Sequence, residues 1–116
     1  MTGNVERFVN KLKNYKAYRI NDKLIMNDEY CLITYTIGFG EVPETTKRFL
    51  ENNYKHLKAV ATSGNKVWGD NFGRAGEIIS KRYNVPLILK FELSGNEIDI
   101  EKFNEEVMRI DTRANA

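Results

Sequence analysis

The chain has 116 residues, of which 41% are hydrophobic and 29% charged, and its formal net charge is +2 at pH 7. These values are ordinary for a soluble globular protein, and the length predicts a single domain. Acidic and basic residues are mixed along the chain, so the basic stripe typical of nucleic-acid-binding proteins is missing. No apolar run reaches membrane-spanning length, and the amino terminus lacks a signal-peptide core, so we expect a cytoplasmic protein.

Cysteine and histidine are too few for a disulfide or metal framework, since the chain has one of each, Cys31 and His56. A single cysteine excludes an intrachain disulfide and fits a reducing compartment. Without a Cys/His cluster, the sequence predicts no protein-built zinc or iron site. Cys31 opens an apolar run, so we interpret it as a small buried hydrophobic residue and not as a catalytic thiol.

The first third of the chain is predicted to form a helix and two strands. A helix is expected over residues 4–13, because apolar side chains follow the spacing of one helical face at Val5, Phe8, Val9 and Leu12. Residues 17–20 predict a short strand, and the mostly polar residues 21–29 predict a connection. Residues 31–36 are β-branched, aromatic and apolar, which predicts a strand buried on both faces.

A second helix is expected after a glycine-rich loop over residues 37–42. Pro43 follows the loop, and proline is favoured at the first position of a helix. Phe49 and Leu50 supply the apolar contacts of this helix, which is expected to end near residues 52–53.

The second half of the chain alternates strand and helix in the same way. Residues 57–61 predict a buried strand, and residues 62–72 predict a loop. The apolar face of the helix that follows is expected at Ala75, Ile78, Ile79 and Tyr83. Asn84 precedes a Val-Pro pair and is expected to end this helix. Residues 87–93 predict a further strand, followed by a turn over residues 94–96.

A final helix is predicted near the carboxyl terminus, with Asp99 as its cap. The inner face of this helix is expected at Ile100, Phe103, Val107 and Ile110. The polar tail from Asp111 is expected to fray. Helices and strands thus alternate with short connections, which predicts an α/β fold with a parallel sheet covered by helices on both sides.

Three loops are expected at one edge of this sheet. The loops after the strands that end at Thr36 and Ala61 open at the carboxyl edge, where α/β folds bind ligands. Residues 1–4 enter the first helix from the same edge. Their backbone N–H groups, with the Thr2 hydroxyl and the Asn4 amide, suit a phosphate, although a helix cap would use the same residue types. The sequence therefore predicts a nucleotide-like ligand divided between three loops.

Aromatic side chains in these loops suit a planar ligand. Trp68 lies among glycines and asparagines, where it is poorly placed for the core, so we favour stacking on a heterocycle. Phe39 lies between two glycines and fits a ligand contact and a loop anchor equally well. The carboxylates of these loops are Glu41 and Asp70, and no histidine lies near either in sequence, so no catalytic residue is predicted. A redox cofactor that brings its own chemistry explains such loops better than side chains acting alone.

Four segments of the sequence resemble the NrdI family, small flavodoxin-like proteins that activate class Ib ribonucleotide reductase. The segments are Thr2–Phe8, Thr34–Pro43, Ala61–Asn65 with Trp68–Phe72, and Val85–Pro86 with Lys90–Gly95. They cover nearly the whole chain in the family's order, whereas a general flavodoxin would share only the Thr-Gly-Asn loop. The resemblance implies a flavodoxin-like three-layer sandwich with a parallel sheet, formed as one domain over residues 1–116.

The resemblance also implies a bound FMN. Its phosphate would be held by Thr2, Gly3 and Asn4. One side of the isoalloxazine ring would be lined by Tyr35, Thr36, Gly38, Phe39 and Gly40. The pyrimidine edge and ring face would be bound by Ser63, Gly64, Asn65 and Trp68. The peptide at Gly38 would reorient near flavin N5 on reduction, a motion that glycine permits at low cost.

The family's role implies three partners. Reduced flavin would react with molecular oxygen, and a superoxide-type oxidant would reach the dimanganese site of the reductase small subunit for tyrosyl radical formation. A second protein would reduce the flavin. The chain would then serve as a flavoprotein activator or electron-transfer accessory whose side chains position and shield the flavin. Two alternatives stay open: a flavin-free flavodoxin-like interaction module and a generic flavodoxin electron carrier.

One departure from the family concerns the start of the chain. Family members begin with a strand that ends in the serine of a Ser-x-Thr-Gly-Asn motif. This sequence starts at the variable residue of that motif, so the strand and the serine are not part of it. We expect either a start that is misassigned or truncated, or remaining strands that close the gap with weakened phosphate binding. In the flavodoxin order this strand is an interior one, and each backbone group left unpaired would cost ~1–3 kcal/mol.

Overall fold

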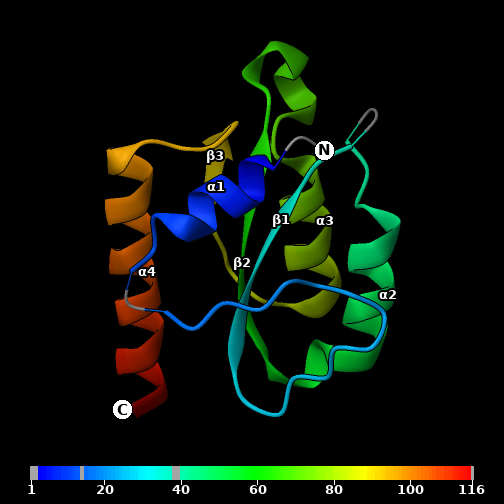
Figure 1. Ribbon diagram of the computed structural model, residues 1–116, viewed down its shortest axis with the longest axis vertical. Helices are drawn as coiled ribbons and strands as arrows, with labels where there is room; N and C mark the ends of the chain where they lie inside the picture. The colour runs from blue at the N-terminus through cyan, green and yellow to red at the C-terminus, as the bar shows by residue number, and fades with distance from the viewer. Residues whose placement is uncertain (1–2, 14, 38–39, 116) are drawn as a thin grey trace.

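The computed structural model describes residues 3–13, 15–37 and 40–115, with the side chains of these residues except those of 68, 70 and 111–115. Three parallel strands form the sheet of this described part, in the order β1 (Tyr30–Tyr35), β2 (Leu57–Gly64) and β3 (Leu87–Glu92). The strands are in register with Thr34 beside Thr62 and Ser63 beside Phe91. The predicted parallel sheet is therefore confirmed (Figure 1).

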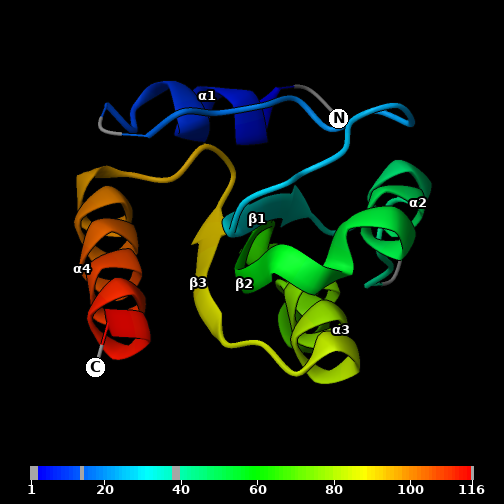
Figure 2. The ribbon, with the colours of Figure 1, turned by 90° about the horizontal axis from the view of Figure 1, so that it is seen from below.

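Helices cover both faces of the sheet, as predicted. Helices α1 (Asn4–Asn10) and α4 (Glu97–Asn115) pack on one face, and α2 (Glu44–Asn53) and α3 (Arg74–Tyr83) pack on the other (Figure 2). Two short 3-10 helices, η1 (Tyr54–His56) and η2 (Lys66–Asn71), lie within the connections before and after β2. Each pair of neighbouring strands is thus joined by a helical crossover, which places the carboxyl ends of all strands at one edge.

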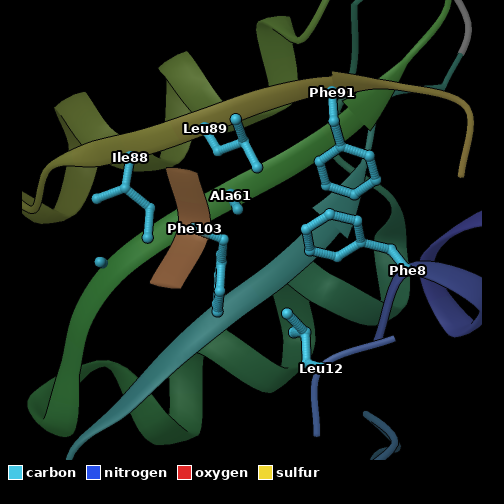
Figure 3. Packing of buried hydrophobic residues seen from close by; sticks show 8 residues of the cluster. Phe8, Leu12, Ala61, Ile88, Leu89, Phe91 and Phe103 are labelled. Atoms are coloured by element: carbon cyan, nitrogen blue, oxygen red, sulfur yellow. The ribbon is translucent and has the colours of Figure 1, made fainter. Parts of the chain in front are cut away.

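The core on the α1 and α4 face is built around three phenylalanines. The rings of Phe8 and Phe91 stack with their centroids 4.0 Å apart, and Phe103 meets Phe8 edge to face at 5.8 Å (Figure 3). Gly95 closes over this cluster with φ 73°, and a Cβ there would lie 2.7 Å from Cδ1 of Phe8. The turn after β3 can pack this closely on α1 only because residue 95 has no side chain.

The core on the other face joins α2 and α3 to the sheet. Its buried members are Leu32, Val42, Phe49, Leu50, Leu57, Val60, Ala75 and Ile79. Two buried hydroxyls, of Thr34 on β1 and Thr46 on α2, lie 3.0 Å apart and satisfy each other. The predicted apolar contacts of Phe49 and Leu50 are confirmed, because both side chains are buried here.

The predicted strand at residues 17–20 is wrong. This segment has no regular structure, Tyr18 is 52% exposed, and β1 pairs only with β2 within the described sheet. A strand needs backbone hydrogen bonds to a neighbouring strand, and residues 17–20 form none with β1, although the outer edge of β1 carries no other strand in the described sheet. The segment from Tyr15 to Glu29 instead passes α1 and wraps around the outer edge of β1 to α2 (Figures 1 and 2).

Helix boundaries also differ from the predictions. Helix α1 ends at Asn10, three residues before the predicted end, and Pro43 immediately precedes α2 instead of opening it. Asn96, not Asp99, caps α4: Asn96 Oδ1 accepts from the Asp99 N–H at 3.0 Å, and Asp99 Oδ2 accepts from the Asn96 N–H at 2.9 Å. This reciprocal capping box assigns Asp99 to the first turn. Helix α4 continues to Asn115 and does not end near Asp111.

Candidate functional site

The loops after β1 and β2 meet at the carboxyl edge of the sheet. The N–H of Thr36 donates to the carbonyl oxygen of Ser63 at 3.1 Å, which ties the ends of the two strands together. A cavity of about 1150 Å³ runs beside β1 for the whole length of the strand, and three separate segments line it at the carboxyl edge, with Gly3, Asn4, Tyr35 and Ser63. The convergence of these segments follows from the parallel topology, which brings successive strand ends to one edge.

Asn4 is held by contacts to the far end of the chain. Its Oδ1 accepts hydrogen bonds from Nη2 of Arg7 at 2.7 Å and from Oγ of Ser94 at 3.0 Å. Gly3 precedes α1 with φ 79°, in the left-handed region that favours glycine, and its carbonyl oxygen accepts from the Arg7 N–H. Thr2, the first predicted phosphate ligand, lies outside the described residues.

Thr36 uses its side chain to start α3. Its buried Oγ1 accepts from the backbone N–H of Ala75 at 3.2 Å, which satisfies one of the free N–H groups at the beginning of that helix. Tyr35 is partly buried and lines the large cavity. The structure thus places Tyr35 toward the cavity and gives the Thr36 hydroxyl an internal role.

The loop between β1 and α2 is closed by backbone hydrogen bonds. Ile37 and Glu41 form an antiparallel bridge, in which the Ile37 N–H donates to Glu41 at 2.9 Å and the Glu41 N–H donates to Ile37 at 2.7 Å. Gly40 is buried with φ 105°, and a Cβ there would lie 2.5 Å from Cδ of Arg74. Glycine is required at position 40 because α3 packs against the loop. Gly38 and Phe39, both predicted site residues, lie outside the described part of the chain.

The end of β2 is tied to the turn after β3. Ser63 Oγ donates to the carbonyl oxygen of Leu93 at 2.6 Å, and the Leu93 N–H donates to Gly64 at 2.9 Å. Asn65 Oδ1 caps η2 by accepting from the Val67 N–H at 3.1 Å. Three predicted ring-binding residues therefore lie together at the end of β2, with part of their hydrogen-bonding capacity used inside the protein.

Trp68 belongs to η2 by its backbone, and its side chain lies outside the described atoms. The neighbouring Val67 is 82% exposed, so this turn projects from the edge of the sheet into solvent (Figure 1). Stacking of Trp68 on a planar ligand stays a prediction.

Cys31 is not suited to nucleophilic chemistry. Burial raises the pKa of its thiol to about 12, so the side chain is neutral at physiological pH. It packs against the core on the α1 and α4 face, in agreement with its interpretation as a small hydrophobic residue. Across the described residues, none of the helices is both long enough and apolar enough to cross a membrane.

Comparison with known proteins identifies the family. A family model described as NrdI flavodoxin-like matches residues 1–105. The chain belongs to this family. The chain is 50% identical over 115 residues to Protein NrdI of Bacillus licheniformis, a match covering 99% of this chain and 88% of the relative. It is 52% identical over 113 residues to the SPbeta prophage-derived protein NrdI of Bacillus subtilis, a match that covers 95% of this chain and 88% of the relative. Protein NrdI of Macrococcus caseolyticus is 45% identical over 116 residues, covering 97% and 90%.

Membership of the NrdI flavodoxin-like family confirms the resemblance found in the sequence and the predicted α/β fold. All the predicted site residues lie inside the matched residues 1–105. Three residues of the site region were not predicted: Arg7 and Ser94, which bind Asn4, and Leu93, which binds Ser63. Arg7 and Ser94 stand in the segments that carried the resemblance, but 87 residues separate them, and only the fold brings them together.

Proposed function

We propose that this protein binds FMN at the carboxyl edge of the sheet and serves as a redox activator of a class Ib ribonucleotide reductase small subunit. The observation that carries the proposal is that Gly3, Asn4, Tyr35 and Ser63 line the carboxyl-edge end of the cavity beside β1, in a chain of the NrdI flavodoxin-like family. A separate flavin-reducing protein and molecular oxygen complete the proposed set of partners.

The residues present fit a phosphorylated planar ligand. Asn4 presents an amide nitrogen that has no hydrogen-bond partner among the described residues, and the adjacent Gly3 adopts the left-handed conformation with φ 79°. Tyr35 contributes a partly buried aromatic side chain to the same cavity. Thr2, Gly38, Phe39 and Trp68 complete the proposed set, with Gly40, Gly64 and Asn65 shaping its loops.

The protein's own groups position and shield the ligand. The Thr36–Ser63 backbone hydrogen bond and the Ile37–Glu41 bridge hold the two strand-end loops in fixed relation. Such fixed loops lower the entropy lost when a ring binds between them. The chemistry that FMN supplies when bound is the reduction of oxygen to a superoxide-type oxidant, which would serve the dimanganese site of the partner in forming its tyrosyl radical.

Flavin binding is tested first, on the purified full chain. We expect added FMN to bind with quenching of its fluorescence, and the visible absorption of the complex to be lost on reduction with dithionite. The second test adds the reduced complex and oxygen to a manganese-loaded class Ib small subunit and measures the tyrosyl radical by electron paramagnetic resonance. Radical formation that requires the protein supports the proposal. Bound FMN without radical formation would favour a generic electron carrier, and a chain that takes up no FMN would favour a flavin-free interaction module.

A further inference from the structure

Three polar side chains form a clamp between the start of α1 and the turn after β3. Arg7 Nε donates to Ser94 Oγ at 2.9 Å, Ser94 Oγ contacts Asn4 Oδ1 at 3.0 Å, and Arg7 Nη2 donates to the same Oδ1 at 2.7 Å. Lys11 reinforces the turn, because its Nζ donates to the carbonyl oxygens of Ser94 at 3.3 Å and Gly95 at 3.1 Å. We call the triangle of Asn4, Arg7 and Ser94 the amide clamp.

The hydrogen bonds of the amide clamp can be assigned donors and acceptors in only one way. A guanidinium group donates and cannot accept, so Arg7 requires an oxygen both at Ser94 and at Asn4. Ser94 Oγ accepts from Arg7 and therefore has its hydrogen free to donate to Asn4. Both lone pairs of the Asn4 side-chain oxygen are then occupied. The orientation of the Asn4 amide is thus determined by its neighbours, and its nitrogen is the group left to face another partner.

The surroundings of this nitrogen favour an anion. Asn4 lines the large cavity and also a second, more polar cavity of about 560 Å³ that Arg7 and Ser94 line as well. In the described part of the chain Arg7 has no ion-pair partner, and its guanidinium lies beside Gly3, since a Cβ at Gly3 would be 3.3 Å from Nη1 of Arg7. A positive charge and an oriented amide donor therefore lie together at the start of α1. The second cavity is also lined by Lys66 and Lys90 and by two carboxylates. Of these carboxylates, Asp99 accepts from the Asn96 N–H and Glu92 accepts from the Lys66 N–H.

We infer that Arg7 and Ser94 are positioning residues that turn the Asn4 amide nitrogen toward the phosphate of the ligand. This inference rests on the proposed function and adds to it a source of selectivity. A phosphate ester needs donors and positive charge at this point, whereas riboflavin has no phosphate there. The amide clamp should therefore favour FMN over riboflavin, and its loss should affect only the phosphorylated flavin.

The test compares the dissociation constants of FMN and riboflavin, measured by fluorescence quenching, for the wild-type chain and its variants. Ser94→Ala removes one of the two bonds that orient the amide, and we expect the dissociation constant of FMN to rise about five- to tenfold. The constant for riboflavin should not change. Ser94→Thr keeps the hydroxyl and should restore FMN binding. Arg7→Gln removes the charged donor of the clamp and should also raise the dissociation constant of FMN without changing that of riboflavin. Arg109→Gln is the matched control: it removes the same charge from α4, where Arg109 pairs with Glu106, and should leave both constants unchanged.

Asn4→Asp keeps the hydrogen bonds of the amide clamp but removes the amide nitrogen that would donate to the phosphate. The carboxylate keeps an oxygen for Arg7 and Ser94, so the thermal midpoint should equal or exceed that of the wild type. It replaces the amide nitrogen by an oxygen, so FMN should bind at least about tenfold more weakly, with riboflavin unaffected. This variant tests the inference even if Ser94→Ala does not fold.

The outcomes are distinguishable. Wild-type protein that binds neither flavin overturns the proposed function and this inference with it. Wild-type protein that binds FMN with an affinity unchanged in Ser94→Ala and Asn4→Asp overturns the inference alone. An equal loss of FMN and riboflavin also overturns it, since that result assigns the clamp a purely structural role.

Discussion

The hydroxyl of Ser63, at the end of β2, donates a 2.6 Å hydrogen bond to the carbonyl oxygen of Leu93, thirty residues further along the chain. The Leu93 N–H donates in return to Gly64 at 2.9 Å, so the turn after β3 is attached to β2 by both backbone groups of one residue. Leu93 adopts φ 55°, which is unusual for a residue with a branched side chain. The edge of the sheet at the candidate site is therefore shaped by a contact between the end of β2 and the turn after β3.

Ser63→Ala should destabilise the protein and loosen the turn. Ser63 is buried, so the variant leaves the Leu93 carbonyl oxygen without its donor, at a cost of about 1–2 kcal/mol in the free energy of unfolding. Urea denaturation measures the change. Ser80→Ala is the matched control, because its hydroxyl donates to the carbonyl oxygen of Val85 at the other end of α3. Both variants should lose stability, but only Ser63→Ala should also weaken flavin binding.

Leu93→Gly should stabilise the fold or leave it unchanged. The left-handed conformation costs leucine about 1 kcal/mol relative to glycine, and relief of this cost offsets the burial lost with a side chain that is 48% exposed. The free energy of unfolding should rise by up to ~1 kcal/mol. Asn84→Gly offers a comparison, because Asn84 has the same φ of 55° but is a residue type that tolerates it. A loss of more than 1 kcal/mol in Leu93→Gly would show that the leucine side chain contributes to packing.

Asn53→Ala should release residues 24–26 from α2. The buried Asn53 side chain accepts from the Met26 N–H at 2.6 Å and donates to the carbonyl oxygens of Leu24 at 3.0 Å and Phe49 at 2.9 Å. Removing the Asn53 side chain leaves these partly or fully buried backbone groups unpaired, so the free energy of unfolding should fall by about 2–3 kcal/mol. The Met26 amide should exchange faster with solvent deuterium. The exposed neighbour gives the control: Asn52→Ala should change stability by less than about 0.5 kcal/mol.

Cys31 should make stability fall at alkaline pH. Desolvation raises the pKa of its thiol from 9.0 to about 12 in the folded protein. Below pH 9 the thiol is neutral in both states, and its contribution to stability is fully present. Between pH 9 and pH 12 the unfolded chain loses the proton while the folded chain keeps it, so stability decreases as the pH rises. The stability of Cys31→Ala, followed by denaturation across this range, should decrease less steeply than that of the wild type, and equal slopes would contradict the pKa shift.

Local pattern was sufficient for much of the fold. The apolar spacing predicted both helices, and Phe49, Leu50, Ala75 and Ile79 are buried as expected, whereas Ile78, assigned to the same inner face, is 39% exposed. Alternation of strand and helix predicted the parallel sheet, because crossovers between short strands leave few other arrangements. The same topology explains why Tyr35 and Ser63 could be placed at one edge from the sequence.

Contacts distant in sequence decided the rest. Residues 17–20 have the composition of a strand but do not pair with β1, and pairing is a property of two segments and not of one. Ser63 and Thr36 were expected to face a ligand, yet their hydroxyls bind Leu93 and Ala75, which the sequence could not place beside them. A motif thus predicts which polar groups gather at the edge of this sheet. Only the packed chain determines which of them are left free, because each hydrogen bond between loops uses a donor or acceptor that a ligand would need.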